Sequence, residues 1–327
     1  MSTANLVPET WHLTGDDAKE TLEHTDRKRL VKDAFVRLRF SDGFSHARSM
    51  AFLGVLVIVQ GVIAAVGMAS ALGKGGLSDS IVKVLHSIVP GQAGKILTQA
   101  VQQAHKTGSS GQWVAIIVGT VGAIVTGTTL IGQIERALNR MYGVEQDRPA
   151  LRKYGRGLLL ALSAGFLAVL AFLVLGLGTA LASSFGSDTA QTIWNILRWP
   201  VGIGLLTAAT AMIMRWSPRR HQPGWSWLSL GALATVGLLA LVTIALNLFF
   251  SFSTSFGSTY GPLAGIIALA FWSYFTSIAL LSGASLSAQL EAIRAGVPEP
   301  KSTRKIAESE PQAATAETQV PVVRQAS

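Results

Sequence analysis

The chain contains two long apolar runs joined by a basic segment: QWVAIIVGTVGAIVTGTTLI (residues 112–131), GQIERALNRMYGVEQDRPALRKYGRG (132–157) and LLLALSAGFLAVLAFLVLGLGTALASS (158–184). Each run is at least as long as the ~20 residues that an α-helix needs to cross ~30 Å of hydrocarbon. The joining segment carries six of the 27 Lys and Arg residues. This alternation is typical of a protein that crosses a membrane repeatedly.

The same pattern extends over the whole chain of 327 residues. Hydrophobic residues make up 49% of it and charged residues 14%, which is too little charge to coat a soluble domain of this size. A proline, Pro200, interrupts the fourth apolar run, which predicts a helix that is short, little tilted or broken there. The sequence therefore predicts an all-α polytopic membrane protein with six transmembrane helices, at about 49–72, 112–131, 158–184, 194–214, 228–250 and 262–290.

The basic residues also predict an orientation. Of the 27 Lys and Arg residues, 22 lie before residue 49, in 132–157, in 215–227 and after 291. Because cytoplasmic loops are enriched in Lys and Arg, both termini are expected in the cytoplasm. The net charge of +9 lies in clusters beside the spans, so anionic membrane lipid is the expected partner and nucleic acid is not.

Segments outside the spans divide the chain further. Residues 1–26 and 297–327 are expected to be disordered tails on either side of a membrane domain over 27–296. The first outer loop is expected to hold two short amphipathic helices, near 81–88 and 96–104. The segment RKRLVKDAFVRLRF (27–40) predicts an interfacial helix, with an ordinary solvated helix as the alternative. Its expected apolar face comprises Leu30, Val31, Ala34, Phe35 and Leu38, with Arg29, Lys32 and Arg37 elsewhere.

Candidate catalytic groups are scarce. The six His residues are scattered without metal-ligand spacing, and there is no Cys, P-loop or GxSxG motif. We therefore expect no enzyme activity, no metal and no cofactor. Since no charged residue lies deep in a span, the polar residues Gln60, Asn247 and Ser285 are the candidates to line a cavity. Gln60 and Asn247 could equally form hydrogen bonds between helices.

The basic hairpin ERALNRMYGVEQDRPALRKYGRG (135–157) is the strongest candidate for a binding site. Gly143 predicts the end of one helix, and Asp147 and Pro149 predict the start of the next. Glu135 is expected to pair with Arg136 or Asn139 and so to orient the basic side chains. A lipid headgroup or a protein partner could bind here; alternatively, the charges only set the topology. The candidate binding residues are Arg136, Arg140, Arg148, Arg152, Lys153 and Arg156.

These residues give the chain a resemblance to the YihY/BrkB family of bacterial inner-membrane proteins, particularly its YhjD-like branch. The resemblance runs from about residue 27 to 294, and its most specific part is R-x-L-N-R-x-Y-G-V at Arg136 to Val144. It also includes the closing GPLAGIIALAFWSYFTSIALLSGASLSAQLEA. Many relatives have a carboxylate where this chain has Ser285, which removes support for any mechanism that requires that acid.

The resemblance implies an inner-membrane protein with a role in envelope integrity, and transport of lipid or lipopolysaccharide precursors for the YhjD-like branch. Some members carry a ribonuclease BN label, which the absence of a nuclease motif does not support. The main hypothesis is a non-enzymatic protein that moves or positions an amphiphilic lipid. The alternative is a scaffold that transports nothing and recruits protein partners through its cytoplasmic hairpin.

Overall fold

The computed structural model describes residues 4–71, 108–182, 187–252 and 263–300. These residues form eight helices and no strand, and six of the helices are long and apolar enough to cross a membrane. The all-α polytopic fold is therefore confirmed. The two shorter helices are α1 (Gly15–Glu23) and α2 (Arg27–Phe40); the six long ones are α3 (Gly43–Ala71), α6 (Gly108–Met141), α7 (Ala150–Ala182), α8 (Asp188–Trp216), α9 (Trp225–Phe252) and α11 (Leu263–Arg294).

The long helices extend beyond their apolar runs. Helix α6 continues to Met141 and α7 begins at Ala150, so the basic hairpin lies on helical extensions of two spans. Helix α8 is continuous through Pro200, and the alternative of a break at this residue is wrong. A proline inside a helix removes only one backbone hydrogen bond and is tolerated in membrane helices, where neighbouring groups compensate for it.

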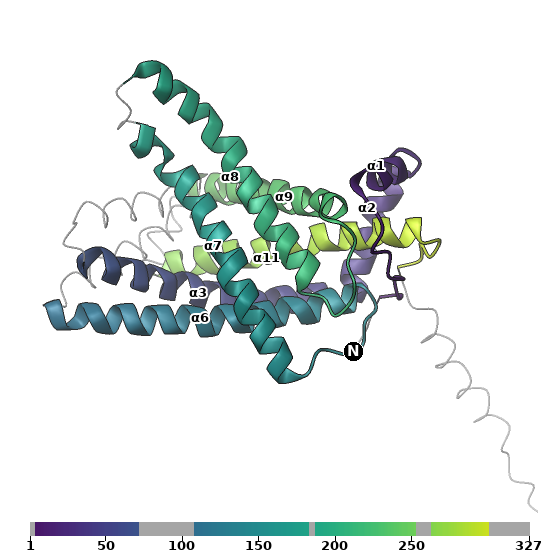
Figure 1. The fold of residues 1–327 in the computed structure, drawn as a ribbon, viewed down its shortest axis with the longest axis horizontal. Helices are drawn as coiled ribbons and strands as arrows, with labels where there is room; N and C mark the ends of the chain where they lie inside the picture. Colours follow the sequence, from purple (N-terminus) through teal and green to yellow (C-terminus); the bar gives the residue numbers. More distant parts are fainter. Residues whose placement is uncertain (1–3, 72–107, 183–186, 253–262, 301–327) are drawn as a thin grey trace, which may run out of the picture.

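Each long helix packs against the next, and the last returns to the first (Figure 1). The neighbours are α3 with α6, α6 with α7, α7 with α8, α8 with α9, α9 with α11, and α11 with α3. Helix α11 also contacts α6 and α2. In the most apolar part of this helix 44% of the residues are buried, against 11–28% in the corresponding part of the other spans. It is therefore the most enclosed of the six.

Small residues set the distance between the packed helices. A Cβ atom on Gly119 of α6 would lie 2.6 Å from the backbone nitrogen of Ala64 in α3. A Cβ on Gly231 of α9 would lie 2.7 Å from the carbonyl oxygen of Gly283 in α11. Membrane helices that approach this closely depend on glycine for backbone contact. Gly119 and Gly231 therefore allow these two pairs of helices to pack with their backbones in contact.

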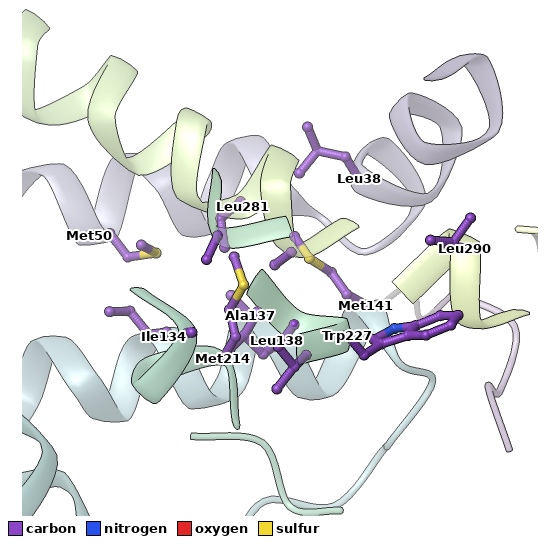
Figure 2. Packing of buried hydrophobic residues seen from close by; sticks show 14 of the residues in the cluster. Leu38, Met50, Ile134, Ala137, Leu138, Met141, Met214, Trp227, Leu281 and Leu290 are labelled. Carbon is purple, nitrogen blue, oxygen red and sulfur yellow. The ribbon is translucent and has the colours of Figure 1, made fainter. Parts of the chain in front are cut away.

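The main apolar core lies at one end of the bundle, and Figure 2 shows its packing from close by. Met50, Leu138, Met214, Trp227 and Leu281 come from five different spans and are all buried there. At the same end the chain links α2 to α3, α6 to α7 and α8 to α9, and the N-terminus lies nearby (Figure 1). We call this the basic end, because it carries the hairpin of residues 135–157.

The N-terminal region differs from the sequence-based expectation. Residues 4–26 were expected to belong to a disordered tail, but they form an extended segment followed by α1. Helix α1 begins with a capping box between Thr14 and Asp17, and it packs on α9 and α11. A polar segment without periodicity can still be ordered when its backbone hydrogen bonds are made to other segments.

Helix α2 forms as predicted, but its faces differ from the expectation. Leu30, Ala34 and Leu38 are buried against the bundle, whereas Val31 and Phe35 are exposed. Arg37, expected away from the apolar face, is fully buried. The helix therefore packs on α11 with a face that includes one cation. The two helices expected in the first outer loop, and most of the expected C-terminal tail, lie outside the described residues.

The close contact between α9 and α11 can be tested with two glycines of the same helix. Gly231→Ala should destabilise the protein by about 1–3 kcal/mol, because the added Cβ overlaps the backbone of Gly283. Gly237→Ala is the matched control, since nothing lies within 4 Å of its added Cβ. Thermal unfolding in detergent should show a lower midpoint for the first variant only. Equal midpoints would contradict the packing described above.

Candidate functional site

The basic hairpin has the local structure predicted for it. Helix α6 ends at Met141, and Gly143 follows with φ +78°, a left-handed conformation that glycine adopts without strain. Helix α7 begins at Ala150, directly after Pro149. Two membrane-spanning helices therefore project beyond their apolar runs and carry the candidate basic residues on their ends.

The sequence suggested that Glu135 pairs with Arg136 or Asn139, but its ion-pair partner in the structure is Arg148. The Glu135 carboxylate accepts from the Arg148 guanidinium at 3.2 Å; the Glu135 side chain is buried and the Arg148 side chain is 12% exposed. Arg148 also donates to the backbone carbonyls of Ser217 and Pro218, at 2.6 and 2.5 Å. Arg148 is therefore a bridge between the hairpin and the α8–α9 connection, and its donors face protein.

A second set of contacts surrounds Asp147. Its carboxylate accepts from Asn139 at 2.9 Å, from Lys153 at 3.1 Å and from Arg136 at 3.2 Å. The Asn139 amide oxygen accepts from the backbone nitrogen of Arg219 at 2.7 Å. Burial raises the pKa of Asp147, but the hydrogen bonds from Asn139 and Lys153 outweigh this and lower it below its ordinary value. We call Glu135, Asn139, Asp147, Arg148 and Lys153 the hairpin clasp.

The remaining candidate cations have different surroundings. Arg152 and Arg156 are exposed, and no carboxylate of the described residues lies within ion-pair distance of either. They are one turn apart on α7, on the face that continues through Leu159 and Phe166, which are 69% and 65% exposed. Arg140 is partly buried. The six predicted residues thus separate into those that hold the fold and those that are available to a ligand.

A buried ion pair that the sequence did not predict lies beside the clasp. The Arg220 guanidinium donates to both oxygens of Glu291, at 2.6 and 3.3 Å, and the two side chains are 2% and 0% exposed. Arg220 also lies 4.4 Å from the centre of the Tyr142 ring. Burial and the nearby Glu291 charge raise the pKa of the Tyr142 phenol. The pair joins the α8–α9 connection to the last turns of α11.

Arg37 of α2 extends this cluster. It donates to Gln289 of α11 at 2.8 Å and to the carbonyl oxygens of Met141 and Asn5, at 2.9 and 3.0 Å. We call Arg37, Tyr142, Arg220, Gln289 and Glu291 the buried cluster. One signal was available in the sequence: Glu291 is the only acid in residues 263–294, near a helix C-terminus where a negative charge is unfavourable without a partner.

The three residues predicted to line a cavity contact different elements. Gln60 of α3 packs against Gly122 of α6, and its Oε1 atom is buried without a hydrogen-bond partner among the described residues. Asn247 is exposed and donates to the carbonyl of Thr243 in its own helix. Ser285 is buried and donates to the carbonyl of Ala34 at 2.7 Å, which joins α11 to α2. Gln60 therefore packs between two helices, and Asn247 and Ser285 each donate a hydrogen bond to a backbone carbonyl.

The acidic side chains at the basic end form ion pairs. Among the described residues, no three His, Cys, Asp or Glu side chains converge as metal ligands do. The carboxylates Glu135, Asp147 and Glu291 all accept from cationic side chains instead. These three carboxylates therefore serve as partners of Arg148, Lys153 and Arg220.

The clasp predicts a specific response to acid. Because the folded-state pKa of Asp147 is lowered, its contribution to stability is fully present above the ordinary value of 3.8 and is lost as the pH falls through the lower folded value. Asp147→Asn should cost roughly 1 kcal/mol at pH 7, and stability should then fall less between pH 5 and pH 3. Glu145→Gln, at an exposed neighbouring position, is the control. The prediction is tested by measuring unfolding midpoints between pH 5 and pH 3. If the midpoint fell equally with pH in Asp147→Asn and in the native chain, the prediction would be contradicted.

Comparison with known proteins gives relatives over most of the chain. A putative ribonuclease-like protein, YfkH, of Bacillus subtilis (strain 168) is 24% identical over 271 residues, which cover 80% of this chain and 94% of that protein. The UPF0761 membrane protein azo3165 of Azoarcus sp. (strain BH72) is 27% identical over 258 residues, covering 75% of this chain and 59% of that protein. The UPF0761 membrane protein RC1_0578 of Rhodospirillum centenum (strain ATCC 51521 / SW) is 25% identical over 278 residues, which cover 83% of this chain and 59% of that protein.

No solved structure matches the chain significantly. The sequence model of the family described as virulence factor BrkB, however, matches residues 34–307. The match begins in α2 and includes all six spans, the hairpin clasp and the buried cluster. The resemblance noted in the sequence is therefore confirmed at the level of the family, and this membrane protein belongs to the BrkB family.

Proposed function

We propose that this BrkB-family protein is a non-enzymatic protein of the bacterial inner membrane that positions an anionic amphiphile and moves it between leaflets. The amphiphile is a lipid or a lipopolysaccharide-precursor-like molecule, and the process contributes to envelope integrity. The basic end faces the cytoplasm in this proposal, as the distribution of Lys and Arg favours. The observation that carries the proposal is the exposed pair Arg152 and Arg156, directly above an exposed apolar stripe on α7.

The geometry of this stripe suits one lipid molecule. Two guanidinium groups one helical turn apart can bind the oxygens of one phosphate, and guanidinium binds phosphate through paired hydrogen bonds. Leu159 and Phe166 continue the same face into the membrane, where they would contact acyl chains. A basic residue at the surface of an anionic membrane contributes about 1 kcal/mol to lipid binding. The two arginines together would contribute about 2 kcal/mol.

The proposal assigns a different role to the hairpin clasp. Arg148 and Lys153 are held by Glu135, Asp147 and backbone carbonyls, so their donors are not available to a headgroup. They fix the start of α7 and thereby hold Arg152 and Arg156 at a constant height relative to the span. Of the six candidate binding residues, Arg152 and Arg156 are therefore the two to which we assign contact with the headgroup.

A scaffold without transport is the second candidate. The observation that favours it is the ordered structure at the basic end, where residues 4–26 and α2 cover the helix ends. An ordered surface of this kind suits protein recognition. The name of the Bacillus subtilis relative suggests a third activity, ribonuclease, but among the described residues no three His, Cys, Asp or Glu side chains converge to hold the metal ion that many nucleases use.

The arginine pair gives a direct test. Arg152→Gln with Arg156→Gln should weaken binding to vesicles that contain phosphatidylglycerol by roughly thirtyfold, corresponding to about 2 kcal/mol. Binding to vesicles of phosphatidylcholine alone should not change. In reconstituted liposomes, the same variant should slow the movement of labelled phosphatidylglycerol between leaflets.

A second double variant controls for net charge. Lys19→Gln with Arg29→Gln removes two positive charges at exposed positions of α1 and α2, away from the α7 stripe. It should leave lipid binding within about twofold of the native protein, since screening weakens distant charges. The proposal is wrong if the two variants behave alike, or if the native protein moves labelled lipid no faster than empty liposomes.

A further inference from the structure

The N-terminal segment of residues 4–10, which we call the strap, runs over the buried cluster. Its backbone nitrogens at Ala4 and Val7 donate to the carbonyls of Arg140 and Tyr142, both at 3.1 Å. The Thr10 hydroxyl donates to the carboxylate of Glu291. Glu9 accepts from the backbone nitrogen of His221 at 3.2 Å. The strap is therefore bonded to α6, to α11 and to the α8–α9 connection.

The strap gives carbonyl oxygens to both cations of the buried cluster. Arg37 donates to the Asn5 carbonyl at 3.0 Å, and Arg220 donates to the Pro8 carbonyl at 2.9 Å. These neutral oxygens occupy the positions that the oxygens of an anion would take beside the two guanidinium groups. A charged acceptor forms a stronger hydrogen bond with guanidinium than a neutral carbonyl does.

The buried cluster also has hydrogen-bond donors left over. Among the described residues, Glu291 is the carboxylate that forms an ion pair with Arg220, whereas Asp33 and Glu9 act on Arg37 and Arg220 through their charge alone. Among the described residues, Arg37 Nη2 and Arg220 Nε are buried without a hydrogen-bond partner. Burial lowers the pKa of Arg37 to about 10, so it remains charged near neutral pH. A buried charged group whose donors lack partners is costly, and an anion that accepted from these donors would reduce this cost.

Gly143 makes the position of the strap possible. A Cβ atom there would lie 2.5 Å from the Cα of Leu6 and 2.7 Å from its nitrogen. The strap thus lies directly on the turn that ends α6, and its carbonyl oxygens lie on Arg37 and Arg220. Displacing residues 4–10 would uncover both cations together.

We propose that Arg37 and Arg220 form a phosphate-binding site that the strap occupies with its own carbonyl oxygens and opens when it is displaced. The phosphate could come from solution or from the headgroup of a phosphate-monoester lipid; the second source deepens the proposed function and rests on it. The site is separate from the Arg152 and Arg156 pair, which is exposed and needs no displacement.

A disulfide between the strap and α11 tests the site without changing either arginine. The native chain has no cysteine, and Val7 packs in one small cluster with Ala288 and Ala292. Val7→Cys combined with Ala292→Cys should hold the strap closed when oxidised. Titration calorimetry in detergent should show that inorganic phosphate binds the reduced protein at least tenfold more tightly than the oxidised protein. Equal binding by the two forms, or no binding by either, would overturn the proposal.

A loosened strap gives an independent measurement that does not depend on forming the disulfide. Thr10→Val removes the hydrogen bond to Glu291 and should increase the affinity for inorganic phosphate several-fold. Thr25→Val is the matched control, because the Thr25 hydroxyl donates only to the carbonyl of Thr21 within the N-terminal region. Unchanged affinity in Thr10→Val, or an equal increase in the control, would count against the site.

The source of the phosphate is distinguished by repeating both titrations with dihexanoyl phosphatidic acid. Binding of inorganic phosphate and this lipid, both lost on oxidation, supports a site that accepts headgroups. Binding of inorganic phosphate alone supports the site and rejects the lipid source. Failure of the proposed function would appear differently, as unchanged vesicle binding in the variant of Arg152 and Arg156, which this experiment does not involve.

Discussion

The ion pair between Arg220 and Glu291 is the interaction on which the basic end depends. It joins two segments 71 residues apart in the sequence, and both side chains are excluded from water. Removing either partner would leave a buried charge uncompensated, at a cost of about 3–5 kcal/mol. Tyr142 lies against the guanidinium on one side, and the strap bonds to both partners. The ends of α6 and α11, the α8–α9 connection and the N-terminal segment therefore have one common point of attachment.

Hydropathy and charge predicted the six spans and the hairpin, because both depend on local composition. A run of apolar residues must cross the membrane as a helix whatever its neighbours are. The partners of the charged residues could not be predicted in the same way. Whether an arginine faces water or protein depends on which distant segment lies beside it, as Arg37 on α2 and Arg148 in the hairpin illustrate. Counting Lys and Arg treats exposed and buried cations alike.

The hairpin and the closing helix also show why a family motif identifies a fold more readily than an activity. Within the motif of residues 136–144, Asn139 belongs to the clasp, Tyr142 lies against the buried pair and Gly143 accommodates the strap. Ser285 of the closing helix supplies a hydrogen bond between α11 and α2. These residues stabilise the arrangement at the basic end, whereas the exposed arginines of α7 lie outside the motif.

The glycine contact between α9 and α11 limits where a lipid could travel. Where Gly231 meets Gly283, the two backbones are too close for even one methyl group, so an acyl chain cannot enter between these helices without separating them. The contact of Gly119 with Ala64 imposes the same limit between α3 and α6. These two helix pairs thus act as closed seams in the wall of the bundle. If an amphiphile crosses the membrane along this protein, as proposed above, it passes outside these two seams, and the exposed face of α7 with Arg152 and Arg156 is one surface that stays open to it.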